Sequence, residues 1–256
     1  LASELISLYA SRKVQEGYSF QSDSPWQSSL ESSFPFQETN DQITTINEVK
    51  ADMELLSPMD RLVCGDVGYG KTEVALRASF KAVNSGKQVA ILVPTTVLAQ
   101  QHFETFINRL QPFPVNIDVL SRFKNKQNQK KIVEKINNGY VDIVIGTHRL
   151  IQKDIKFKNL GLLIIDEEHK FGVSHKEFLS KFYKNIDILS LSATPIPRTL
   201  QMSLSGIRDM STIETPPNER LPIKTFVSEK KNSIISEAIL REKDRGGQVF
   251  FLHNRV

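Results

Sequence analysis

The chain has 256 residues, of which 39% are hydrophobic, and it carries a net charge of +4 and a single cysteine. This composition is typical of a globular protein that can hold one large α/β domain and part of another. It excludes an intrachain disulfide, and because no apolar run approaches the roughly 18 residues of a membrane span and no stretch resembles a signal peptide, it predicts a soluble, cytoplasmic protein without membrane contact.

Residues 1–38 are predicted to form an N-terminal amphipathic helix followed, over 17–36, by an irregular Ser- and Pro-rich connector. Three aromatic side chains are expected to anchor that connector on a neighbouring element: Trp26, Phe34 and Phe36. A second helix is predicted from Thr39 to about residue 56, because Thr39 and Gln42 have the spacing of a capping box.

From residue 61 onward, short apolar runs alternate with segments of helical period. The predicted strands are 61–65, 88–93, 116–120, 141–146, 162–166 and 188–192. The predicted helices are 71–85, 96–110, 126–138 and 175–183. Strands that are apolar on both faces and separated by helices of this length predict a doubly wound, parallel α/β sheet whose ligand lies at the carboxyl ends of the strands.

The pattern changes after residue 213, where a proline-containing linker is predicted over 214–222. Residues 223–256 then follow the order strand, helix, strand, with the elements expected at 223–227, 230–243 and 248–252. A unit of this size is too small to bury a core of its own. We therefore expect residues 39–213 to form one domain and 223–256 to open a second α/β domain of a longer polypeptide.

A glycine-rich loop follows the first strand of the predicted sheet. It has the pattern G-x-x-x-x-G-K-T and comprises Gly65, Asp66, Val67, Gly68, Tyr69, Gly70, Lys71 and Thr72. Glycines let the backbone N–H groups wrap around a phosphate chain, and a helix that begins there adds its positive dipole end. Lys71 is expected to reach the β and γ phosphates and Thr72 to ligate Mg²⁺. The loop therefore predicts a bound nucleoside triphosphate.

The apolar strand 162–166 runs into the acidic sequence Asp166-Glu167-Glu168-His169. Consecutive carboxylates at the end of a buried strand are costly unless a cation lies nearby. We expect Asp166 to hold Mg²⁺ through a bound water and Glu167 to polarise the water that attacks the γ-phosphate. Lys71, Asp166 and Glu167 are thus the predicted catalytic residues.

Three more predicted strands are followed by hydroxyl-bearing residues that suit phosphate contacts without base reading. These segments are Pro94-Thr95-Thr96, Gly146-Thr147-His148-Arg149 and Ser192-Ala193-Thr194. With the glycine-rich loop and the acidic sequence, they occur in an order that resembles motifs I, Ia, Ib, II and III of superfamily 2 helicases and translocases. Residues 59–75, 171–173, 194–200 and 205–209 are most similar to the bacterial transcription-repair coupling factors.

This resemblance implies a RecA-like P-loop NTPase lobe of an ATP-driven double-stranded DNA translocase. Its family displaces stalled RNA polymerase and recruits excision-repair proteins, here through regions outside the segment. The resemblance implies that Gln42 contacts adenine and that Phe36 is a candidate for stacking on the base. DNA-backbone contacts are carried over to Thr95, Thr96, Thr147, His148 and Arg149, and coupling of hydrolysis to movement to His169, Ser192, Thr194 and Arg198.

The same family completes its ATP site with arginines from a second lobe, and the segments that carry them do not occur in this sequence. An arginine finger contributes about 10³ to 10⁵ in rate. We therefore expect the chain alone to bind Mg-ATP but to hydrolyse it slowly.

Four alternatives remain open. RecG-type branched-DNA helicases are related to the coupling factors, although they tend to carry serine and glutamine where this chain has Tyr69 and Glu168. A signalling GTPase needs an Asn-Lys-x-Asp element, and the similar segment 125–128 ends in Asn128. A small-molecule kinase has no use for the hydroxyl-rich strand ends. The fourth is a non-enzymatic module whose docking surface ATP controls.

Overall fold

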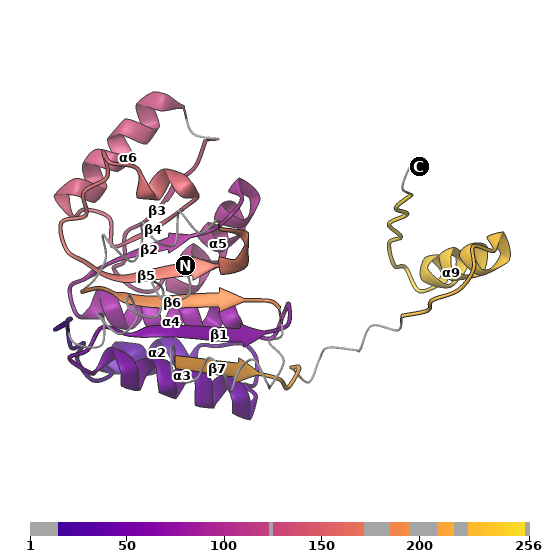
Figure 1. Cartoon of the computed structure of the whole chain (residues 1–256), viewed down its shortest axis with the longest axis horizontal. Helices are drawn as coiled ribbons and strands as arrows, with labels where there is room; N and C mark the ends of the chain where they lie inside the picture. The colour runs from indigo at the N-terminus through magenta and orange to yellow at the C-terminus, as the bar shows by residue number, and fades with distance from the viewer. Residues whose placement is uncertain (1–14, 123–124, 172–184, 195–208, 218–224, 254–256) are drawn as a thin grey trace, which may run out of the picture. The chain divides into compact units, whose positions relative to one another are not determined.

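The computed structural model describes residues 15–122, 125–171, 185–194, 209–217 and 225–253 (Figure 1). Two compact units are distinguished, Leu1–Asn218 and Glu219–Val256. The helices predicted over 1–15 and 175–183 lie outside the described residues, apart from Gln15.

A seven-stranded sheet lies at the centre of the first unit, in the order β3-β4-β2-β5-β6-β1-β7 (Figure 1). Every neighbouring pair is parallel. The strands are β1 (Asp60–Gly65), β2 (Gln88–Leu92), β3 (Ile117–Leu120), β4 (Ile143–Gly146), β5 (Leu160–Asp166), β6 (Asp187–Ser192) and β7 (Asp209–Ile213). The predicted parallel α/β fold is confirmed, and β7, which pairs with β1 at the edge, is a strand that the sequence analysis did not predict.

The helices of this unit are α2 (Pro25–Ser32), α3 (Asn40–Met53), α4 (Lys71–Asn84), α5 (Thr96–Leu110) and α6 (Lys126–Asn138), with the 3-10 helices η1 (His148–Ile151) and η2 (Glu168–Lys170). The predicted helices at 71–85, 96–110 and 126–138 are confirmed, and α3 ends three residues before its predicted limit of 56. No described helix is both long and apolar enough to cross a lipid bilayer.

Both faces of the sheet are covered. On one face, Ile91 of β2 belongs to a core that includes Phe80 of α4 and Phe106 of α5. On the other face, Leu92 belongs to a second core with Ile136 of α6. Because neighbouring residues of a strand point to opposite faces, burial on both sides explains why the strand sequences are continuously apolar.

The connector differs from its prediction, because residues 25–32 form the helix α2. Ser24 caps this helix and a proline occupies its first turn, which is a helix-start signature within a segment whose Ser and Pro content resembles a loop. The predicted anchor Phe36 is also wrong, since it is 57% exposed, whereas Trp26 is 52% exposed but packs against Phe113 with ring centroids 6.4 Å apart. Phe20 and Leu30, exposed by 2% and 0%, pack the segment on the core instead.

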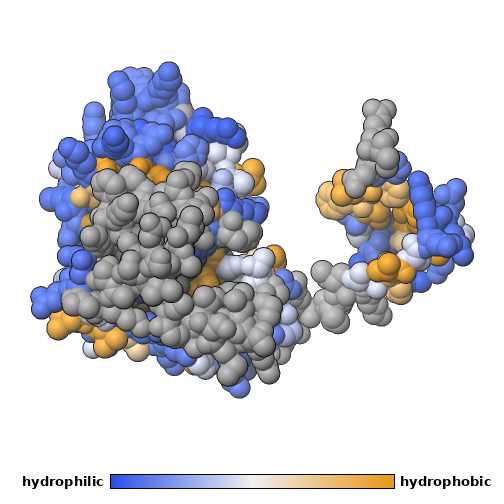
Figure 2. Space-filling model, in the orientation of Figure 1, coloured by the Kyte–Doolittle hydropathy of each residue, from blue (hydrophilic) through white to orange (hydrophobic). Residues whose placement is uncertain are grey.

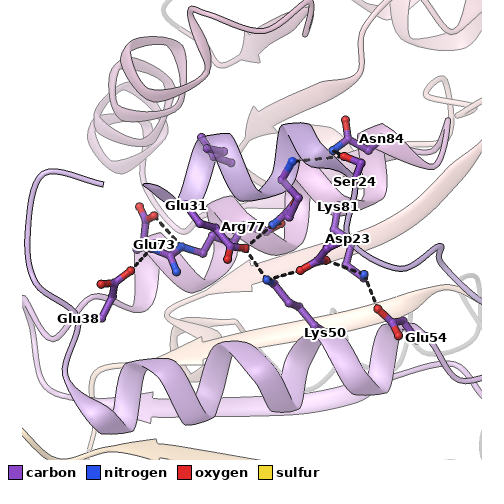
Figure 3. A network of polar contacts seen from close by, with 12 residues as sticks. Asp23, Ser24, Glu31, Glu38, Lys50, Glu54, Glu73, Arg77, Lys81 and Asn84 are labelled. Carbon is purple, nitrogen blue, oxygen red and sulfur yellow. Dashed lines mark hydrogen bonds and ion pairs between the residues drawn. The ribbon is translucent and has the colours of Figure 1, made fainter. Parts of the chain in front are cut away.

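Buried charges of α4 tie this segment to the rest of the fold (Figure 3). Arg77 pairs with Glu38 at 2.7 Å, and Lys81 pairs with Asp23 at 3.0 Å. Asp23 also accepts a hydrogen bond from Lys50 of α3 at 2.6 Å. Arg77 and Lys81 are almost fully buried, so leaving either without its partners would be costly. The pairs therefore fix the segment against α3 and α4.

Asp23 gives this network a predictable pH dependence. Burial alone would raise the pKa of its carboxyl, but the hydrogen bonds from Lys50 and Lys81 outweigh burial, and the pKa lies below its ordinary value. A carboxyl whose pKa is lowered on folding stabilises the protein above its unfolded pKa and loses that contribution as the pH falls. We expect Asp23→Asn to lower the free energy of unfolding at pH 7 and to flatten its decline below about pH 4.

Urea denaturation at a series of pH values measures both effects. Glu104→Gln, on the exposed face of α5, removes the same charge and is the matched control. Equal unfolding curves for the two variants at every pH would contradict the role given to Asp23.

The second unit contains one regular element, α9 (Asn232–Asp244), among its described residues. It confirms the helix predicted over 230–243, but the described parts of the two predicted strands, 225–227 and 248–252, are not strands. Strands need a pairing neighbour for their backbone N–H and C=O groups, and the described residues of this unit supply none. Several large apolar side chains are consequently exposed (Figure 2): Phe226, Val227, Phe250, Phe251 and Leu252.

Candidate nucleotide-binding site

The predicted site residues that follow β1, β5 and β6 lie at one rim of the sheet, because the carboxyl ends of parallel strands lie at the same edge. Gly65 ends β1, Asp166 ends β5 and Ser192 ends β6. In the sheet order, β6 alone separates β1 from β5. The glycine-rich loop and the acidic sequence therefore begin about 10 Å apart, which is two inter-strand spacings.

The glycine-rich loop has the backbone that a phosphate cradle requires. Gly68 and Gly70 have φ values of 82° and 87°, in the left-handed region that glycine tolerates best. A Cβ on Gly70 would come within 2.4 Å of the Gln42 amide nitrogen. Gly70 also precedes the first residue of α4, and no side chain caps this helix. The first N–H groups of α4 thus form an anion site of the kind found at helix N-termini.

Lys71 lies at the start of α4 and is 9% exposed. Its ammonium donates to the carbonyl oxygens of Gly65 and Asp66 at 2.6 and 2.9 Å. Burial lowers the pKa of Lys71, and the carboxylates of Asp166 and Glu167 act in the opposite direction. A further anion beside the ammonium would favour its charged form again. The loop and its lysine accordingly fit a triphosphate.

The acidic sequence carries a backbone feature that points to function. Glu167 has a φ of 52°, the one positive φ among the non-glycine residues that the structure describes. Such a conformation costs of order 1–3 kcal/mol and is typically found at active sites. Its N–H donates to Oδ1 of Asp166 at 2.9 Å, and Asp166 is 8% exposed.

The remaining donor set fits Mg²⁺ that is bound together with a nucleotide. Within the described ranges, no group of three His, Cys, Asp or Glu side chains could hold a metal ion. Mg²⁺ characteristically takes one or two carboxylates and completes its shell with water and phosphate oxygens. Asp166 and the half-buried Thr72 can provide that partial set.

Gln42 connects the predicted adenine contact to the loop. The predicted capping box is present, with Thr39 and Gln42 bonded to each other's backbone N–H. The Gln42 amide nitrogen also donates to the carbonyl oxygen of Tyr69 at 2.9 Å. Phe36, the candidate for stacking, packs edge-to-face on Phe34 with ring centroids 5.6 Å apart. The adenine contacts of Gln42 and Phe36 stay predictions.

Three of the five predicted DNA contacts are buried or cap a helix. Thr95 caps α5 by accepting from the Leu98 N–H at 3.2 Å, and the next residue, Thr96, is buried. Thr147 is buried as well and precedes η1.

The other two predicted contacts follow Thr147. His148 is exposed, whereas Arg149 forms a two-pronged ion pair with Asp154, at 2.7 and 2.6 Å. The sequence analysis did not foresee this pair, which gives Arg149 a carboxylate partner within the chain.

The predicted coupling residues are only partly described. Ser192 and Thr194 share a hydrogen bond of 2.7 Å between their hydroxyls, at the end of β6. His169 lies in η2, but its side chain is outside what the structure describes, as is the whole of Arg198.

Sequence reasoning missed His102, whose Nε2 lies 2.7 Å from Oδ2 of Asp166. The side chain is buried on the face of α5 that also buries Ala99, Phe106 and Leu110. A histidine between apolar residues on the core face of a helix needs a hydrogen-bond partner inside the fold. The helical spacing of His102 with these apolar residues could therefore have revealed a buried polar contact in the sequence.

The structure also removes the GTPase alternative. Asn125 caps α6 by accepting from the Asn128 N–H at 2.8 Å, so the segment similar to a guanine-binding element serves as a helix start. It follows β3, which is five positions from β1 in the sheet. That separation is about 24 Å, too far for one nucleotide to contact both segments closely.

The chain is similar to known proteins both in sequence and in structure. The chain is 58% identical over all 256 residues to the transcription-repair-coupling factor of Bacillus subtilis (strain 168) and 57% identical to that of Staphylococcus haemolyticus (strain JCSC1435). It spans 22% of the length of each, about a fifth. A solved structure of RecG bound to a three-way DNA junction matches 96% of this chain and 34% of its own, with a TM-score of 0.80 and 35% identity.

A family model described as DEAD/DEAH box helicase matches residues 39–203. This match includes the glycine-rich loop, the acidic sequence and the strand ends described above, and it covers more than half of the chain. The chain belongs to the DEAD/DEAH box helicase family.

Proposed function

We propose that this chain is the ATP-binding lobe of a double-stranded DNA translocase that belongs to a transcription-repair coupling factor. The observation that carries the proposal is the arrangement at the rim, where the buried Lys71 experiences the charges of Asp166 and Glu167. The strained backbone of Glu167 supports a site built for hydrolysis, and not only for nucleotide-controlled docking.

Each residue of the rim has a role in this proposal. The glycine-rich loop holds the triphosphate, Lys71 neutralises its charge, and Thr72 and Asp166 hold the metal. Bound Mg²⁺ supplies positive charge that polarises the phosphoryl group. Glu167 orients the attacking water and accepts its proton. Gln42 selects adenine from its position beside Tyr69.

The whole-protein activity extends beyond this segment. We propose that residues 39–213 form the first lobe, 214–222 a linker and 223–256 the start of a second RecA-like lobe. Exposed apolar residues such as Phe250 support the last assignment, because a completed lobe would cover them. The full protein would move along duplex DNA in the bacterial cytoplasm, displace stalled RNA polymerase and recruit excision repair through other regions.

A RecG-like branched-DNA helicase is the second candidate. The fold similarity to RecG favours it, but the identity of 35% is well below the 58% to the Bacillus subtilis coupling factor. Polymerase displacement distinguishes the two, since only a coupling factor is expected to release a stalled transcription complex.

Nucleotide turnover tests the proposal. In a protein that combines this segment with a complete second lobe, duplex DNA is expected to stimulate ATP hydrolysis. The 256-residue chain alone should bind Mg-ATP and hydrolyse it slower by about 10³-fold or more, because arginine fingers are missing. Fast, DNA-stimulated hydrolysis by the chain alone, or no binding of Mg-ATP to it, would refute the proposal.

Asp154 offers a test of the predicted contact between Arg149 and the DNA backbone. Its ion pair with Arg149 competes with any phosphate for the same guanidinium. We expect Asp154→Asn to strengthen duplex binding and to steepen its salt dependence by roughly one phosphate contact. Fluorescence anisotropy with a labelled duplex at several salt concentrations measures both quantities.

Asp142 provides the matched control. It accepts hydrogen bonds from Asn116 just before β4, at the opposite rim of the sheet. Asp142→Asn makes the same charge change away from Arg149. Equal strengthening by both variants would indicate a bulk charge effect, and no strengthening by Asp154→Asn would remove Arg149 from the DNA contact.

A further inference from the structure

One buried contact joins the acidic end of β5 to the helix whose start is predicted to face DNA. His102 of α5 and Asp166 are 64 residues apart in the chain and 2.7 Å apart in space. They are 6% and 8% exposed, respectively. In such a site, water neither screens the interaction nor replaces it, so the contact is part of the internal structure of the rim.

The direction of this hydrogen bond follows from the other ring nitrogen. Nδ1 of His102 is buried and has no hydrogen-bond partner within the described part of the chain. A proton on Nδ1 would leave a buried donor without an acceptor, which is the costlier choice. We therefore place the proton on Nε2, which donates to Oδ2 of Asp166. Oδ1 accepts from the Glu167 N–H, so each oxygen of this carboxylate is oriented by one donor.

The helix α5 connects this contact to the predicted DNA surface. Thr95 caps α5 and Thr96 begins it, and His102 follows six residues after Thr96, about 9 Å along the axis. Between and beyond them, Ala99 and Phe106 are completely buried in the core. A helix packed in this way moves as a unit, so a displacement of its start also displaces His102.

We infer that His102 is a positioning residue, which holds the Asp166 carboxylate in the orientation that Mg²⁺ requires and makes the metal site sensitive to DNA at the start of α5. The inference rests on the proposed function, because it takes the protein to bind Mg-ATP and duplex DNA. Hydrogen-bond partners of metal-ligating carboxylates are known to govern metal affinity by fixing the ligand.

Two substitutions of His102 distinguish its orientation of the Asp166 carboxylate from its packing in the core. His102→Gln places an amide nitrogen near the position of Nε2, whereas His102→Asn is shorter and places it near Nδ1. Only the glutamine can still donate to Asp166. Binding of a fluorescent ADP to the 256-residue chain is measured at increasing Mg²⁺. We expect His102→Asn to raise the half-saturating Mg²⁺ concentration by about 10- to 100-fold and His102→Gln to restore it close to that of the unsubstituted chain.

Leu110→Ala is the packing control, because it loosens the same buried face of α5 about two turns beyond His102. It should lower the melting temperature and leave the Mg²⁺ requirement unchanged. If the unsubstituted chain does not bind the nucleotide, the proposed function fails. If it binds, but the half-saturating Mg²⁺ concentration of His102→Asn equals that of His102→Gln, the role of His102 is overturned and the proposed function stands.

Folding of the variants is checked by circular dichroism. Should both His102 variants be unfolded, the ring resonances of His102 in the unsubstituted, ¹⁵N-labelled chain decide. A protected Nε2 proton that shifts when Mg²⁺ is added to the nucleotide-bound chain supports the inference, and a resonance that does not respond to Mg²⁺ overturns it.

The link to DNA is measured in a protein that carries both lobes. Duplex DNA should lower the Mg²⁺ concentration needed for nucleotide binding in the unsubstituted protein and in His102→Gln, but not in His102→Asn. An equal effect of DNA on all three would overturn the coupling through α5.

Discussion

Replacing Glu167 by glutamine is expected to slow ATP hydrolysis by about 10²- to 10⁴-fold while Mg-ATP remains bound. Glutamine has nearly the same shape but cannot accept the proton of the attacking water. The loss corresponds to about 3–5 kcal/mol of barrier. Single-turnover hydrolysis and equilibrium nucleotide binding, in a protein that carries both lobes, measure the two quantities separately.

Glu168→Gln removes the same charge from the next residue and is the control, with hydrolysis expected to stay close to that of the unsubstituted protein. The Glu167→Gln protein should also stop moving along DNA, which displacement of a third strand from a triplex reports. Continued movement would remove Glu167 from the mechanism, whatever the rate of hydrolysis.

Replacing Lys71 by alanine is expected to weaken Mg-ATP binding by about 10- to 100-fold, because one charge-assisted contact to phosphate is lost. In the unsubstituted chain, burial lowers the pKa of Lys71. The ammonium is charged below its pKa, so nucleotide affinity should decline as the pH rises, beginning below the usual range of lysine near 10. Calorimetric titration of the 256-residue chain at several pH values measures both effects.

Lys130 is an exposed residue of α6, and Lys130→Ala is the control for the change in net charge. Its nucleotide affinity should equal that of the unsubstituted chain at every pH. An unchanged affinity of Lys71→Ala would show that the glycine-rich loop does not hold the triphosphate through this side chain.

Local patterns predicted the part of the site that is contiguous in sequence. The glycine-rich loop follows from its own spacing, and the capping box at Thr39 and Gln42 appears where it was expected. The predicted parallel arrangement of the strands brought the glycine-rich loop and the acidic sequence together, because the carboxyl ends of parallel strands lie at one rim. The placement of these two segments at one rim was therefore predictable from the sequence.

Contacts between residues far apart in the chain could not be predicted from local sequence patterns. The partner of His102 is 64 residues away, and periodicity shows only that its side chain faces the core. The edge strand β7 has few apolar residues, and its pairing with β1 makes it a strand. The segment 248–252 is the opposite case. Its apolar residues predict a strand, but no described segment pairs with it, and it does not form one.

The position of β6 between the loop strand and the acidic strand sets a fixed dimension. Hydrogen bonds between backbones hold adjacent strands about 4.8 Å apart whatever side chains they carry. Substitutions along β6 can thus alter stability without changing the gap that a nucleotide has to bridge. A nucleotide bound at this rim would therefore meet the ends of β1 and β5 at a separation that the side chains of β6 do not set.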